Sequence, residues 1–221
     1  MTYQRNALGA GVQPSNPFEN RRDSPLASIV FYLHRLQWDG KERIPTLFPA
    51  LCGTADNPYH QHAAKVLMLS AAARILDPGC RVDQWLVLEG RQGVGKSTFL
   101  QVLFGKDYFS TRNRPEMWCI EISEIDRLSK AEAMQLKKML DASTDSMRRQ
   151  GIYVMATHEA SLPTDLDATR RFLPVRIQCV DVDSLAAIRD QLWAEAMARL
   201  WRGESWQQPT VAPTSTMEIT P

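Results

Sequence analysis

One run of residue types has the chemistry of a phosphate-binding site. Residues 90–97 read Gly-Arg-Gln-Gly-Val-Gly-Lys-Ser and match the pattern G-x-x-x-x-G-K-[ST] in full. Glycines let backbone N–H groups converge on phosphate oxygens, and a following helix offers its positive amino-terminal end. Lys96 would reach the β- and γ-phosphates of ATP, and the Ser97 hydroxyl would ligate Mg²⁺. The residues expected to contact the nucleotide are Gly90, Gln92, Gly93, Val94, Gly95, Lys96, Ser97 and Thr98.

The residues around this pattern support the same interpretation. An apolar run of strand length, residues 85–89, comes before it, and a helical pattern follows it. A glycine-rich turn between a strand and a helix can match the pattern without binding any ligand. The strand-before and helix-after context that the motif requires favours a nucleotide site.

Hydrolysis of ATP also needs an acid near Mg²⁺ and a group that orients water. Glu121 and Glu124 follow four apolar residues, about 25 residues after the loop, where a second core strand is expected. Glu121 would hold the hydration shell of Mg²⁺, and Glu124 would polarise the attacking water as a general base does. The two carboxylates could exchange these roles. Solvated carboxylates at the end of a surface strand are the alternative interpretation.

Two further positions carry polar groups at strand ends. Thr157 and His158 follow the third apolar run and would lie beside the γ-phosphate if that strand neighbours the loop strand. Arg170 and Arg171 precede the last run and are candidates for an arginine finger that reaches a neighbouring subunit's γ-phosphate. The alternatives are an ordinary loop histidine and a solvated basic turn.

The elements that must hold these residues follow from hydrophobic patterning. From Trp85 onward, short apolar runs alternate with helical segments, which predicts an α/β fold with a parallel central sheet. The predicted strands cover residues 85–89, 117–122, 152–157 and 173–177. The first predicted helix begins at a Ser24 cap, and a second, short one falls within residues 38–53. A third covers residues 62–76, a fourth starts at a capping box over 129–132, and the last covers 184–201. We expect a disordered arm over 1–22, a helical segment over 23–80, a nucleotide-binding core over 81–208 and a disordered tail over 209–221.

Composition narrows the classes of protein. The formal net charge is +1 over 221 residues, so any contact with DNA would need a local cluster of Arg and Lys. The four cysteines (Cys52, Cys80, Cys119 and Cys179) lie far apart, which argues against zinc and a disulfide frame and favours buried thiols. No apolar stretch has the length of a signal peptide or a membrane span. We therefore expect a cytoplasmic protein with no membrane partner.

Several segments together resemble the virulence-associated protein E family of phages and mobile islands, which is similar to superfamily 3 helicases of the AAA+ class. The resemblance covers roughly residues 26–206 and implies an AAA+-like three-layer α/β fold, Mg-ATP and ring assembly, with six subunits expected. It also implies a role in replicating mobile-element DNA. The segments are "LQWDGKERI", "AARILDPGCRVDQWLVLEGRQGVGKSTFLQVLFG", "MWCIEISEID", "TRRFLPVRI" and "DQLWAEAMARLWRGESW". Arg170 and Arg171 fall where the family has its "RRF" arginines.

The chain departs from this family in three places. It reads "ATHE" where relatives have "TTN", so His158 stands in for the sensor asparagine. It is short before residue 151, where relatives carry a longer basic and aromatic stretch ending in a pore hairpin, and only Arg148 and Arg149 remain there as phosphate contacts. We also expect no primase or origin-binding domain, because the first 80 residues or so are too few and too helical for a primase.

Three functions compete on these residues. An ATPase motor would act on DNA, with single strands favoured. A non-motor scaffold or inhibitor would keep ATP bound and dock on a phage or host replication protein. A small-molecule kinase would need an acceptor pocket, and the sequence offers only Arg112 and Arg114 toward one. The whole-chain resemblance to replication ATPases favours the motor.

Overall fold

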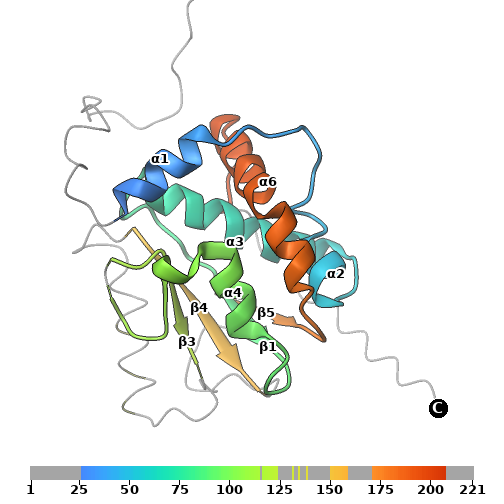
Figure 1. Cartoon of the computed structure of the whole chain (residues 1–221). Helices are drawn as coiled ribbons and strands as arrows, with labels where there is room; N and C mark the ends of the chain where they lie inside the picture. The colour runs from blue at the N-terminus through green and yellow to red at the C-terminus, as the bar shows by residue number, and fades with distance from the viewer. Residues whose placement is uncertain are drawn as a thin grey trace, which may run out of the picture.

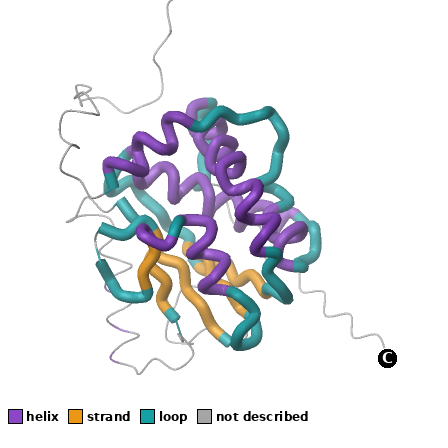
Figure 2. Tube along the Cα trace, in the orientation of Figure 1, coloured by secondary structure: helices purple, strands orange, loops and turns teal. Residues whose placement is uncertain are grey.

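The computed structural model describes residues 26–114, 116–123, 150–158 and 171–207, together with Ala131, Met134 and Lys138. Within these residues the chain forms helices gathered on one side of a sheet (Figure 1). Figure 2 shows the same arrangement, with loops joining the helices to the strands. The predicted arm, the tail and the Ser24 cap lie outside the described residues.

The sheet has five parallel strands in the order β2-β3-β4-β1-β5. The strands are β1 Trp85–Glu89, β2 Phe109–Ser110, β3 Cys119–Ile122, β4 Ile152–Thr157 and β5 Phe172–Arg176. The prediction of an α/β fold with a parallel sheet is confirmed. Strand β1 lies between β4 and β5, so all five of its side chains are buried. Strand β2 was not predicted, because two residues leave no pattern to read.

The two faces of the sheet carry separate apolar clusters. Leu86 and Leu88 of β1 face the main core, while Trp85 and Val87 belong to a smaller cluster on the other face. This alternation follows from the two-residue repeat of a strand. All the described helices of eight residues or more contribute to the main core (Figure 1). The predicted helix from residue 129 lies outside the described residues except at Ala131, Met134 and Lys138, which are helical.

The helices follow the predicted order with changed boundaries. They are α1 Ala27–Arg35, α2 Leu47–Cys52, α3 Pro58–Leu76, α4 Lys96–Phe104 and α6 Val182–Trp201, with a short 3₁₀ turn, η1, at Lys106–Tyr108. Helix α3 begins four residues before the predicted His62. Asn57 caps it by accepting a hydrogen bond from the His60 N–H, and Pro58 occupies the first turn. None of the described helices combines the length and apolar character that crossing a membrane requires.

Three aromatic side chains tie α4, α6 and the sheet together. The rings of Trp118 and Trp193 have their centroids 4.3 Å apart, and Phe104 packs edge-on against both. Each indole N–H is satisfied, Trp118 by the Ala71 carbonyl and Trp193 by the Leu103 carbonyl. Buried tryptophans need such partners, so this cluster fixes where α4 lies.

The cysteines correct one expectation. All four thiols are free, and Cys52 and Cys119 are buried as predicted. Cys80 is half-buried and Cys179 is exposed, so the prediction of buried thiols is wrong for Cys179. Cys179 follows β5 in a turn, where no pattern of apolar residues marks its surroundings.

Candidate nucleotide site

The glycine loop, residues 90–97, joins the central strand β1 to helix α4. Two of its glycines are required by close contacts. A Cβ on Gly90 would lie 2.8 Å from the carbonyl oxygen of Ile177, and a Cβ on Gly95 would lie 3.1 Å from Val180. Gly95 also has φ +103°, a conformation that side chains disfavour. The segment after β5 therefore packs directly against the loop.

Lys96 is held inside the loop by the loop's own backbone. Its side chain is buried, and Nζ donates hydrogen bonds to the carbonyl oxygens of Gly90 and Arg91. Lys96 is also the first residue of α4, whose initial N–H groups have no partner within the helix. A positive side chain and the positive end of a helix thus meet at one point, as an anion site requires.

Ser97 contacts the carboxylate of Glu121 in strand β3. Its hydroxyl donates to Oε1 of Glu121 over 2.9 Å, and the Ser123 hydroxyl donates to the same oxygen over 2.9 Å. Glu121 is only 2% exposed, and its Oε2 atom has no hydrogen-bond partner among the described residues. A buried carboxylate oxygen without a donor is costly unless another group completes it.

The donor set fits Mg²⁺ held jointly with phosphates. Mg²⁺ prefers oxygen ligands and usually takes one or two carboxylates together with waters and substrate phosphates. Ser97 Oγ and Glu121 Oε2 supply that chemistry at the mouth of the loop. Within the described ranges no group of three His, Cys, Asp or Glu side chains could hold a metal by itself. The site therefore suits a cation that arrives with its substrate.

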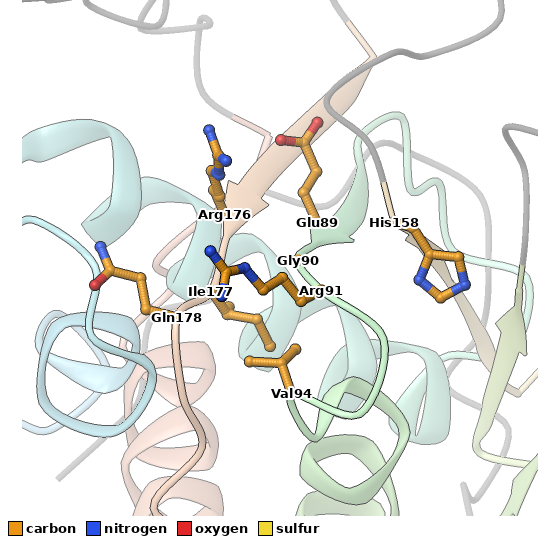
Figure 3. Close-up of a pocket in the computed structure, with 8 residues that line it drawn as sticks. All are labelled: Glu89, Gly90, Arg91, Val94, His158, Arg176, Ile177 and Gln178. Carbon is orange, nitrogen blue, oxygen red and sulfur yellow. The ribbon is translucent and has the colours of Figure 1, made fainter. Parts of the chain in front are cut away.

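A cavity of about 760 Å³ opens beside the loop. Figure 3 shows Arg176 and Gln178 on one side of the loop, His158 on the other and Glu89 between them. The lining residues are Glu89, Gly90, Arg91, Val94, His158, Arg176, Ile177 and Gln178. The volume is in the range of small-molecule pockets.

The position of His158 follows from the pairing of β4 with β1. Thr157 lies in register with Glu89, and its carbonyl accepts a hydrogen bond from the Gly90 N–H over 3.3 Å. The condition that this strand neighbours the loop strand is therefore met. His158, the next residue, lines the cavity, and its Nδ1 is buried without a hydrogen-bond partner among the described residues.

Glu89 is a cavity residue that sequence reasoning missed. It ends β1 and lies in register with Arg176 of β5. Burial raises the pKa of its carboxyl group, and the charge of Arg176 opposes that shift. The available signal was an acidic residue closing an otherwise apolar strand, directly before the glycine loop.

A model of the virulence-associated protein E-like domain matches residues 33–219, most of the chain. The chain belongs to the virulence-associated protein E-like family. None of the curated proteins matches it. In this virulence-associated protein E-like chain, the matched range contains the glycine loop, Glu121 and the whole cavity.

Arg171 of this family member lies at the amino-terminal ends of the strands, opposite the glycine loop. Its carbonyl accepts a hydrogen bond from the N–H of Trp85, the first residue of β1, whereas the glycine loop follows the last. The two ends of β1 are four residues apart, which in a strand is about 13 Å. Arg171 is exposed and does not line the cavity of its own chain.

The remaining predicted residues divide in two. Gln92 and Thr98 are exposed on the glycine loop and the first turn of α4. Glu124, Arg148, Arg149 and Arg170 lie outside the described residues. The structure thus brings together the loop, Glu121 and His158, and it separates Arg171 from them.

Proposed function

We propose that this chain is a P-loop ATPase of AAA+-like fold that binds Mg-ATP at the glycine loop and hydrolyses it to act on DNA in phage or mobile-element replication. The observation that carries this proposal is the contact between Ser97 and Glu121, with Glu121 Oε2 left unpaired and buried. A hydroxyl and a carboxylate beside a lysine-bearing glycine loop make a site for a phosphate-bound cation.

Each described residue of the site has a role that its position supports. The N–H groups of the loop and of α4 would bind phosphate oxygens, and Lys96 would exchange its two carbonyl acceptors for them. Bound Mg²⁺ would neutralise charge that develops on the phosphates. Glu121 would orient a water of the cation's shell, and His158 would donate a hydrogen bond to the γ-phosphate. Glu124 is expected to orient the attacking water.

Action on DNA and ring assembly rest on membership of the family and on Arg171. The exposure of Arg171 at the strand ends opposite its own glycine loop supports a role in the site of another subunit. We propose a homo-oligomeric ring, with six subunits expected, that engages single-stranded DNA. A phage or host replication protein is the expected protein partner.

The test is steady-state ATP hydrolysis with and without single-stranded DNA. Lys96→Ala and Glu121→Gln should each reduce the rate at least 100-fold, because each removes charge that the phosphates or the cation need. Lys106→Ala, an exposed lysine just after α4, should retain the wild-type rate. Equal rates for wild type and Lys96→Ala would refute the ATPase.

A non-motor scaffold is the second candidate, and His158 is the observation that favours it. An imidazole occupies the place where relatives have an asparagine, and its reach differs from that of an amide. In that case ATP would bind with an affinity that depends on Lys96, while turnover would stay at the level of Lys96→Ala. Calorimetric titration with ATP and Mg²⁺, run beside the hydrolysis assay, separates the two candidates.

A further inference from the structure

We propose that the chain has a second binding surface, for single-stranded nucleic acid, where α1 meets the carboxyl end of α6. The surface consists of aromatic rings, two of which have an arginine guanidinium over them, and is here called the aromatic–cation row. Its members are Phe31, His34, Arg35, Trp38, Trp201 and Arg202. None of them lines the cavity beside the glycine loop.

Two rings of the row are exposed in a way that packing does not explain. Phe31 is 63% exposed and Trp201 is 57% exposed. Among the described residues, only Met134 is another large apolar side chain of comparable exposure. Two of the three therefore lie on one small face. Exposed apolar surface concentrated in this way marks a contact site.

Two rings of the row are paired with an arginine, and a third, Trp201, packs against the His34 ring. The Arg35 guanidinium lies 5.3 Å from the centroid of the Phe31 ring, and the Arg202 guanidinium lies 5.1 Å from that of Trp38. The rings of His34 and Trp201 are 6.1 Å apart. Phe31 and Arg35 are one helical turn apart on α1, so they share a face.

The charge of the row suits a polyanion. The nearest carboxylates in sequence are Asp39, Glu42 and Glu204, and each is paired outside the row. Asp39 pairs with Arg43 over 2.7 Å, Glu42 with Arg199 over 3.5 Å, and Glu204 with Arg199 over 3.5 Å and with Lys65 over 3.6 Å. Arg35 and Arg202 make no ion pair with a described carboxylate. Their guanidinium groups remain available for phosphates.

Rings and guanidinium groups together select a single strand. Unpaired bases stack on aromatic side chains, and arginines beside those rings contact the phosphates or the bases. In a duplex the base faces are covered, so the rings would contribute nothing. The row therefore fits a short stretch of single-stranded DNA or RNA.

The row lies far from the nucleotide site. Val180, just before α6, contacts Gly95 of the glycine loop, and Trp201 ends the same helix. A helix of 20 residues is about 30 Å long. Figure 1 shows α1 and the carboxyl end of α6 at the end of the molecule away from the loop between β1 and α4. The inference deepens the proposed action on DNA, and it requires no ATP turnover.

The experiment measures the binding of a fluorescein-labelled oligo(dT) 20-mer by anisotropy, without ATP, for the whole chain and for Lys96→Ala. We expect Phe31→Ala and Trp201→Ala each to weaken binding five-fold or more, and Trp201→Phe to retain most of the affinity. Arg35→Ala and Arg202→Ala should each lower the slope of log K against log[salt] by about 0.7. Met134→Ala, which removes an equally exposed apolar side chain outside the row, should bind as the wild type does.

Several results would overturn the inference. These are no binding by the wild type, unchanged binding by the alanine variants, or equal binding to a matched duplex. Sedimentation velocity provides a further check: if Trp201→Ala changes the oligomeric state and leaves oligonucleotide affinity intact, the row is an interface between copies of the chain. Because Lys96→Ala should still bind the oligonucleotide, loss of ATPase activity and loss of this surface are separable. Thermal unfolding checks that each variant is folded.

Discussion

A carboxylate without access to solvent must find its partners inside the protein, and Glu195 finds them in two segments. Its Oε2 accepts hydrogen bonds from the backbone N–H groups of Arg43 (2.6 Å) and Ile44 (3.0 Å), and Oε1 pairs with Arg199 at 2.8 Å. Its exposed fraction is 0%. Through these contacts one residue of α6 anchors the loop before α2.

We expect Glu195→Ala to lower the free energy of unfolding by about 3 kcal/mol, since two amides and a mostly buried guanidinium lose their acceptor. Glu42→Ala is the matched control: it removes another carboxylate from Arg199, but one that is 68% exposed. That change should stay within about 0.5 kcal/mol. Urea denaturation measures both, and equal effects would contradict this account of the buried carboxylate.

His62 makes stability depend on pH. Burial lowers its pKa, with a smaller opposing contribution from the hydrogen bond to Gln84. The folded protein therefore binds the proton less readily than the unfolded chain, whose histidines titrate near pH 6.5. The resulting stabilisation is present above that pH and is lost as the pH falls toward the folded pKa.

Between pH 7 and pH 5, His62→Gln should therefore lose less stability than the wild type. Denaturation curves at several pH values measure this difference, in which the contributions of the other titrating groups cancel. At pH 8 the offset between the two proteins should no longer change with pH. Parallel loss of stability in both proteins down to pH 5 would exclude His62 as a source of the dependence.

At the scale of elements, the glycine loop is shaped by the segment that follows β5. Gly93 and Gly95 both have positive φ, +80° and +103°, but only Gly95 would place a Cβ against a neighbour, Val180. Gly93→Ala should therefore cost about 1 kcal/mol from backbone strain alone. Gly95→Ala should lower the free energy of unfolding by about 1–3 kcal/mol more than Gly93→Ala, because its Cβ would crowd Val180. It should also shift the start of α4.

Thermal or urea unfolding compares the two alanine variants, and ATP titration reports whether the loop still binds. Equal destabilisation would mean that Val180 moves aside without penalty. Which variant is less stable depends on how the segment after β5 packs against the glycine loop. The sequence around either glycine does not reveal that packing.

Sequence reasoning worked best where an element is buried and regular. β1 and β4 have the predicted bounds because each is a continuous apolar run between turn residues. Glu121 was predicted as the next-to-last residue of a strand and holds that position in β3, but its burial against Ser97 was not predicted. That burial decides the chemistry of Oε2, and it arises from contacts between residues far apart in the chain. The aromatic–cation row is invisible in the sequence for the same reason, since it joins residues 31–38 to 201–202.

At the scale of the whole molecule, the position of Arg171 makes an assembly testable. Arg171 lies at the start of β1, whereas the glycine loop of its own chain follows the end of that strand. Arg171→Ala and Lys96→Ala should each be inactive alone, and a mixture should regain part of the ATPase activity if subunits share sites. Full activity of Arg171→Ala would eliminate the arginine finger. Inactivity of the mixture in an assembly of confirmed size would eliminate sharing between subunits.

Helix α6 connects the glycine loop with the aromatic–cation row. Its first turn follows Val180, which contacts Gly95 of the glycine loop, and its last residue is Trp201 in the aromatic–cation row. If the helix turned as a rigid rod of about 30 Å about its loop end, a tilt of about 5° would move the far end by about 2.6 Å. Such a shift is comparable to the width of an aromatic ring. A small tilt of α6 at the glycine loop would thus move the aromatic–cation row, by a distance that grows with the length of the helix.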